Sequence, residues 1–240
     1  MNKQQRKEQK QREKDERQLR NILDWRDYLS EHRTILVFDT ETSGLDPEYS
    51  DILSLSWQLI EFEGNHSWHI QQERTCYFEW VSDKRVSCRA IEVNGLTKER
   101  LAELGTIERA DGIKEFGKAL SQADLLVAHN GKFDKKFVKS LAFELHREFI
   151  MNDPEEGYLF MDIREDMNKP LYDTMKRMTT YCALPHCNGG YKWPRLSELA
   201  QCLKIDDSDI DYHQSAADVE LTKRCFCAII DAGLDCVPQN

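Results

Sequence analysis

The strongest signal in this sequence is the stretch TILVFDTETSGL at residues 34–45. Residues 34–38 are β-branched and apolar, which predicts a buried strand, and turn-forming residues follow at 44–47. Asp39 and Glu41 stand two positions apart at the end of this strand, so their side chains point to the same side. Two carboxylates placed in this way repel each other, and a bound divalent cation is the usual compensation. Two solvated acids at a strand end are the simpler alternative for this pair taken alone.

The pattern that follows this strand predicts an α/β domain. Two more strands joined by short turns suggest an antiparallel meander, and helices then alternate with one short buried strand. We therefore expect a mixed sheet with helices packed on its faces. The further strands are expected at residues 52–62, 68–80 and 125–128, and the helices at 96–104, 107–120, from 133 onward, 171–181, 196–203 and 216–230.

Length and composition limit the class of protein. The chain has 240 residues, of which 40% are hydrophobic, enough for one sizeable core. It has no apolar run long enough to cross a membrane and no secretory signal, so we expect a cytoplasmic protein whose eight cysteines are reduced. We expect a charged arm with a docking helix at residues 1–33 and one folded domain at 34–235, with an acidic, irregular insertion at 148–169.

The charge of the chain is unevenly distributed. The net charge is −10, yet residues 1–20 hold eight basic and four acidic residues, so the other 220 residues carry −14. Affinity for a phosphate backbone comes from Lys and Arg, so a body this acidic does not hold nucleic acid by bulk electrostatics. If the protein acts on nucleic acid, it does so through a local site, and we expect a divalent cation there.

Three more residues that could bind a metal ion or transfer a proton lie at the ends of predicted strands or the starts of predicted helices. Asp134 follows the strand at 125–128, a position where sites in α/β sheets gather, and His213 and Asp218 flank the start of the last helix. Each has a structural alternative: helix-dipole stabilisation for Asp134, a surface position for His213, and a capping box started by Ser215 for Asp218. Together, four carboxylates could bind two Mg²⁺ or Mn²⁺ ions ~3.5–4 Å apart, as in displacement at phosphorus. The candidate set is Asp39, Glu41, Asp134, His213 and Asp218.

These residues carry a resemblance to a known family. Residues 38–45 closely resemble the first motif of the DEDDh 3′–5′ exonucleases, which include the proofreading epsilon subunit of bacterial replicases, ribonuclease T and oligoribonuclease. Residues 129–134 match the second motif, and His213 followed by Asp218 matches the third. Gln214 stands where the tyrosine branch of the family would have Tyr, which indicates the histidine branch. The resemblance implies a ribonuclease H-like fold, in agreement with the predicted strand order.

The resemblance also implies roles for the candidate residues. Asp39 would bridge two metal ions, Glu41 and Asp218 would hold the ion that carries the attacking water, and Asp134 would hold the second ion near the leaving 3′ oxygen. His213 would be the general base, for which imidazole is suited by its near-neutral pKa. The product would be a nucleoside 5′-monophosphate.

A second group of residues is implied to bind the terminal nucleotide. The backbone that follows the first strand would hold the 3′-terminal nucleotide, the leucine after it would wedge against the base, and two residues of the second motif would line the same pocket. These residues are Thr42, Ser43, Gly44, Leu45, Asn130 and Phe133.

We therefore expect a stand-alone, metal-dependent 3′–5′ exonuclease that acts on single-stranded ends, on DNA rather than RNA. An exoribonuclease with the same site is an alternative, because the 2′-hydroxyl contacts that separate the two polymers are not readable from sequence. A non-catalytic binding module of the same fold is another. A homodimer, and a protein partner docked on residues 1–33, are further alternatives left open.

Two features stand outside these motifs. Cys182, His186, Cys187 and Cys202 could in principle form a zinc site, but their spacing favours reduced thiols. Residues 191–199 resemble a segment that stand-alone members of the family carry before the last motif. There Lys192, Trp193 and Arg195 could touch a phosphate and stack on a base, or the tryptophan could pack under a loop.

Overall fold

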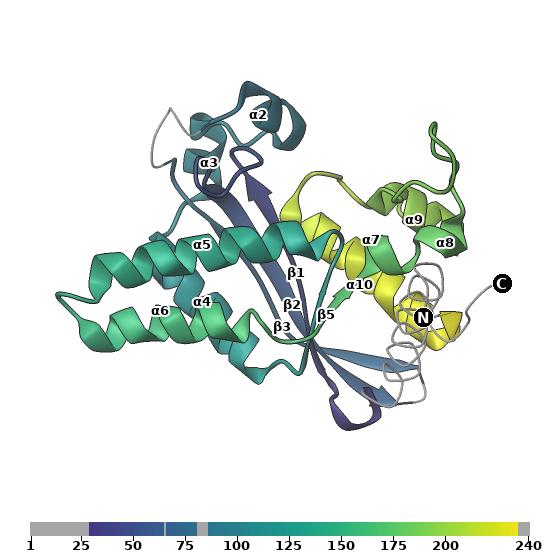
Figure 1. The fold of residues 1–240 in the computed structure, drawn as a ribbon, viewed down its shortest axis with the longest axis horizontal. Coiled ribbons are helices and arrows are strands. Elements are labelled where there is room, and N and C mark those ends of the chain that lie inside the picture. The colour runs from purple at the N-terminus through teal and green to yellow at the C-terminus, as the bar shows by residue number, and fades with distance from the viewer. Residues whose placement is uncertain (1–28, 65, 81–85, 235–240) are drawn as a thin grey trace, which may run out of the picture.

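The computed structural model describes residues 29–64, 66–80 and 86–234. Its centre is a five-stranded mixed sheet in the order β3-β2-β1-β4-β5 (Figure 1). The first three strands pair antiparallel, while β4 runs parallel to β1 and β5 runs parallel to β4. This confirms the predicted α/β class with a mixed sheet. The strands are β1 Thr34–Thr42, β2 Ile52–Gly64, β3 Ser67–Tyr77, β4 Leu125–Ala128 and β5 Leu171–Asp173.

Helices cover both faces of the sheet (Figure 1). On β1 the side chains alternate: Leu36 and Phe38 join a core cluster with α4, α5 and α6, while Ile35 and Val37 join a second cluster with α9 and α10. This period of two fixes which face each later residue of β1 points to. The helices are α2 Cys88–Asn94, α3 Lys98–Leu104, α4 Arg109–Gln122, α5 Gly131–Phe149, α6 Pro154–Asp166, α7 Thr174–Arg177, α8 Thr179–Cys182, α9 Leu196–Leu203 and α10 Ser215–Asp231.

Two expectations about local structure are wrong. The segment 171–181, predicted to be one helix, begins with the strand β5 and continues as the short helices α7 and α8. Strand β5 pairs with β4, so tertiary pairing overrides the local helical pattern. The segment 148–169, expected to be irregular, contains helix α6, whose Phe160 and Ile163 are buried in the first core cluster.

Several expectations about the chain ends lie outside the described residues. The arm at 1–20 and most of the docking helix at 21–33 fall there, although Leu29, which is described, is buried against the sheet face covered by α10. The boundaries at 34 and 235, the insertion at 148–169, the homodimer and the partner of residues 1–33 stay predictions. In the part of the chain that the structure describes, no helix is long and apolar enough to span a membrane.

Candidate active site

The two carboxylates of β1 lie on the sheet face that α10 covers. Asp39 and Glu41 continue the odd-numbered row of side chains that includes Val37, so they point away from α5 and toward α10. They stand opposite Ser56 and Ser54 of β2. The pairing register shifts just after Glu41. The sequence therefore placed both acids correctly on one face at the end of a buried strand.

Helix α10 brings the third carboxylate to this pair. Ligand atoms of Asp39, Glu41 and Asp218 all lie within 4.8 Å of one another. The alternative that Ser215 caps the last helix is wrong, because Gln214 is the N-cap residue and its side chain accepts no capping hydrogen bond. The Ser215 hydroxyl is buried instead between two serine hydroxyls of β2, at 2.7 Å from each. These bonds fix the first turn of α10 against the sheet and so point Asp218 at β1.

Asp134 approaches from the opposite face of the sheet. It lies in the first turn of α5, is 3% exposed, and accepts hydrogen bonds from the backbone N–H of Thr40 at 3.1 Å and from its hydroxyl at 2.7 Å. Both bonds reach the same oxygen of the carboxylate. Asp134 is therefore not one of the three converging acids, although its charge is felt by Asp39.

Burial raises the pKa of every acid in this group. Desolvation is the largest cause for each, and the neighbouring carboxylates add to it for Asp39 and Glu41. The pKa of Asp39 lies well above its usual value, that of Glu41 rises to about 8, that of Asp134 to about 7 and that of Asp218 to about 6. A bound cation would oppose these shifts, because it stabilises the ionised form of nearby acids.

The converging acids fit a divalent cation. Their donor atoms are all carboxylate oxygens, the ligands that Mg²⁺ and Mn²⁺ prefer. One oxygen of Asp218 is buried and has no hydrogen-bond partner, which leaves it available to a ligand ion. Among the described residues, this is the one group of three or more potential metal ligands. Within the described part of the chain, the Cys and His residues near 182–202 do not form such a group.

His213 lies at the rim of this cluster. It is exposed, just before α10, and its backbone adopts a left-handed conformation with φ of 66°. Its charge and its backbone both favour the ionised form of Asp218. Imidazole near the three acids and open to solvent can take up a proton and release it.

The residues expected to bind a terminal nucleotide surround the end of β1. Thr42, Ser43 and Gly44 are buried, whereas Leu45 is 86% exposed. A Cβ on Gly44 would lie 2.4 Å from the hydroxyl of Ser50, so this turn requires glycine or movement of that side chain. The two residues of the second motif frame the start of α5: Asn130 precedes it at a φ of 69°, and the half-buried ring of Phe133 packs on Phe137.

Two residues that support the site were missed in the sequence. Asn94 ends α2, donates from its amide to the carbonyl of Thr42 at 3.1 Å, and hydrogen-bonds Glu41, which lowers the pKa of that acid. Asp173 ends β5, accepts from the backbone N–H of Asn130 at 3.2 Å and raises the pKa of Asp134. Asn94 before Gly95 looks like an ordinary turn residue, and Asp173 inside a helical pattern looks like an ordinary surface acid.

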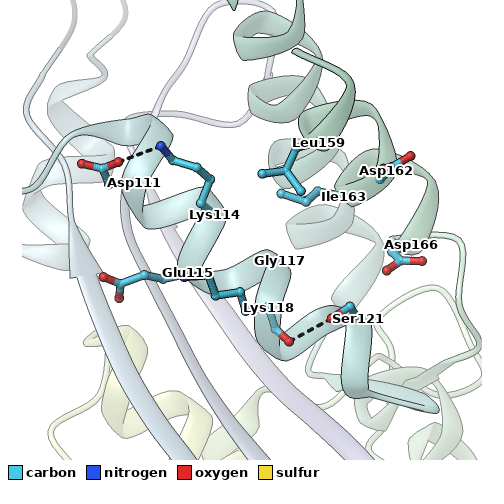
Figure 2. A pocket seen from close by; sticks show the side chains of 10 residues that line it. All are labelled: Asp111, Lys114, Glu115, Gly117, Lys118, Ser121, Leu159, Asp162, Ile163 and Asp166. Atoms are coloured by element: carbon cyan, nitrogen blue, oxygen red, sulfur yellow. Dashed lines mark hydrogen bonds and ion pairs between the residues drawn. The ribbon is translucent and has the colours of Figure 1, made fainter. Parts of the chain in front are cut away.

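Two of the hollows on the described surface differ in their chemistry. The larger, about 590 Å³, lies between α4 and α6 (Figure 2). It contains none of the clustered acids, and cations and anions are mixed along it, as in the Lys114–Asp111 ion pair. The smaller, about 230 Å³, is bordered by Glu41, Asn94 and His213. The smaller hollow therefore adjoins the acid cluster.

The sequence matches a known family model and is similar to known polymerases. Residues 36–226 match the family model RNase_T, described as "Exonuclease". The PolC-type DNA polymerase III of Bacillus subtilis is 26% identical over 201 residues, which is 81% of this chain and 11% of the polymerase. The same type of polymerase from Mycoplasma genitalium is 26% identical over 194 residues, 80% of this chain and 11% of the polymerase. The chain thus spans about a tenth of the length of these curated relatives.

Solved structures show the same fold. Escherichia coli exonuclease I in complex with a dT13 oligonucleotide superposes with a TM-score of 0.61 at 16% identity, over 82% of this chain and 41% of that one. Exonuclease I from Methylocaldum szegediense gives a TM-score of 0.59 at 18% identity, over 82% of this chain and 40% of the other. At this level of identity the match concerns the arrangement of the sheet and helices.

Proposed function

The chain belongs to the exonuclease family RNase_T, as a nuclease of the DEDDh type, and on that premise we propose that it removes nucleotides from the 3′ ends of single-stranded DNA with the help of two divalent cations. The observation that carries the proposal is the convergence of Asp39, Glu41 and Asp218 within 4.8 Å. Acids that approach so closely in a buried place are costly unless cations neutralise them.

The proposed ligands divide between the two faces of the sheet. Asp39, Glu41 and Asp218 would hold one ion, and Asp134 together with Asp39 would hold the second, through the Asp134 oxygen that Thr40 does not engage. Bound Mg²⁺ or Mn²⁺ supplies positive charge to the developing negative charge at phosphorus and at the leaving oxygen. Thr40 and Asn94 keep the ligand carboxylates in place through the hydrogen bonds described above.

His213 is the proposed general base. A water molecule would lose a proton to the imidazole as its oxygen attacks the terminal phosphodiester, and the 3′ oxygen of the remaining strand would leave. The phosphate then stays on the released residue as a nucleoside 5′-monophosphate. Because the side chain is exposed, it can pass the proton to solvent and return to its neutral form.

A single-stranded DNA end is the proposed substrate. The residues proposed for the terminal nucleotide belong to the end of β1 and the start of α5, which the hydrogen bond between Thr40 and Asp134 joins, and Leu45 is exposed enough to meet a base. The curated relatives are DNA polymerases, and a structural neighbour was crystallised with dT13. Both facts favour DNA over the exoribonuclease alternative.

The test is cleavage of 5′-labelled single-stranded DNA and RNA of matched sequence, with Mg²⁺, Mn²⁺ or EDTA. We expect a ladder that shortens from the 3′ end on DNA, with no cleavage in EDTA or by Asp39→Asn. Asp162→Asn, on the exposed side of α6, is the matched control and should retain activity. If RNA were shortened faster than DNA, the exoribonuclease alternative would be favoured instead. Binding of intact strands without cleavage under every condition would favour the non-catalytic module.

A further inference from the structure

The segment 174–197, from α7 to the start of α9, has an unusual charge for this chain. It contains four basic residues and no acidic residue, whereas the whole chain has a net charge of −10. Two of these cations form ion pairs with acids just outside the segment, Lys176 with Asp173 and Lys192 with Glu198. A local positive segment on an acidic protein favours polyanions. Its basic residues are Lys176, Arg177, Lys192 and Arg195.

The same segment exposes aromatic rings. Trp193 is 62% exposed and Tyr191 is 54% exposed, so the alternative that Trp193 packs under a loop is wrong. The ammonium group of Lys176 lies 5.9 Å from the centre of the Trp193 ring, which holds a cation beside the aromatic face. Exposed rings interleaved with cations are the composition of surfaces on which bases stack.

Two contacts tie this surface to the candidate active site. His129 of the second motif lies 3.0 Å from the carbonyl of Pro194, next to Trp193. Lys176 forms an ion pair of 2.8 Å with Asp173, the residue that also accepts from the backbone of Asn130. Trp193 is therefore held on the side of the site where Asn130 is expected to border the terminal nucleotide.

We infer that segment 174–197 is a platform for the single strand whose end enters the active site. A base stacks on Trp193, and the basic side chains lie along the phosphates. The inference rests on the proposed function, since it assigns the platform to the substrate of that same site. Stacking and phosphate contact are common to DNA and RNA, so the platform itself does not discriminate between the two polymers.

The test compares an oligonucleotide with a mononucleotide ester that has no strand to lie on the platform. Trp193→Ala and Trp193→Phe are assayed on a dT13 oligonucleotide and on the p-nitrophenyl ester of thymidine 5′-monophosphate, which fills only the terminal position. For the alanine variant we expect kcat/KM on dT13 to fall roughly 5- to 150-fold, mainly through KM, which corresponds to the ~1–3 kcal/mol of one stacked base. The ester should be cleaved at the wild-type rate, and phenylalanine should restore most of the loss.

Controls separate this inference from the proposed function. Tyr158→Ala removes an equally exposed ring, 61% exposed, from α6 and should leave both substrates unaffected. An equal loss on ester and oligonucleotide, or no loss on either, would overturn the platform. If the wild-type protein cleaves neither substrate, the proposed function fails. Fluorescence anisotropy of labelled dT13 then decides the platform, since weaker binding by Trp193→Ala supports it and unchanged binding rejects it.

Discussion

At the scale of single residues, the site is a group of acids that the fold holds in an unfavourable state. Burial raises the pKa of Glu41 to about 8 and of Asp218 to about 6, well above the value near 4 that such acids have in an unfolded chain. At pH values between the unfolded pKa near 4 and these raised pKa values, the folded protein therefore binds more protons than the unfolded chain. Its stability without metal falls as the pH rises through this range.

The first prediction follows from that sign. In protein freed of metal with EDTA, we expect the melting temperature to drop between pH 5 and pH 8, and to drop less in Asp39→Asn, which removes one of the repelling charges. Thermal melts followed by circular dichroism at several pH values measure this. Asp162→Asn makes the same change of charge on the exposed side of α6. Equal slopes for Asp39→Asn and wild type would contradict the assigned repulsion.

The second prediction concerns Asn94, which is 9% exposed and hydrogen-bonds both Glu41 and the carbonyl of Thr42. Asn94→Ala leaves the carbonyl without that donor and removes an interaction that favours ionised Glu41. We expect a loss of about 1–3 kcal/mol of stability and a several-fold higher Mg²⁺ concentration for half-maximal cleavage. Gln122→Ala, which removes an exposed amide from the end of α4, serves as control. An unchanged Mg²⁺ titration would show that Asn94 does not position Glu41.

At the scale of elements, the site depends on how one helix is fixed to the sheet. The Ser215 hydroxyl, 2.7 Å from both Ser54 and Ser56, joins the first turn of α10 to β2. Because Asp218 is one turn further along the same helix, its approach to Asp39 and Glu41 follows from this contact. The positions of the three acids therefore depend both on the register of β1 with β2 and on how α10 packs on the sheet.

The third prediction tests this link. Ser215→Ala leaves the two β2 hydroxyls without their shared partner, so we expect about 1–3 kcal/mol of destabilisation and a smaller stabilisation by Mg²⁺ than in wild type. Urea unfolding with and without metal measures both effects. Ser121→Ala, an exposed serine of α4 that bonds its own helix, should do neither. A destabilised variant with a full metal response would show that α10 keeps its position without the serine.

At the scale of the whole molecule, a bound cation would join elements that are far apart in the chain. The converging acids come from β1 and α10, at the two ends of the described domain. An ion that they share binds the folded protein and not the unfolded chain, in which the ligands are scattered. Mass action then couples metal concentration to stability.

The fourth prediction is that Mg²⁺ or Mn²⁺ at millimolar concentration raises the melting temperature at pH 7.5, with a size that grows with the logarithm of metal concentration. The increase should be largely lost in Asp39→Asn and retained in Asp162→Asn. Differential scanning fluorimetry against a Ca²⁺ and an Na⁺ series gives the measurement. If neither Mg²⁺ nor Mn²⁺ shifted the melting temperature of the wild-type protein, that result would argue strongly against a metal site.

The sequence by itself determined the buried strand at 34–38, the two acids on one face after it, the mixed sheet and the family, because these depend on local period and on motifs only a few residues long. It also identified every acid that the structure brings near Asp39. Tertiary structure alone decided that Asp134 approaches through Thr40, 94 residues away, and that Ser215 bonds Ser54, 161 residues away, rather than capping its helix. It alone placed Asn94, Asp173 and exposed Trp193 around the site. Such partnerships arise from strand register and from which helix covers which face, and neither is written in any local stretch of the chain.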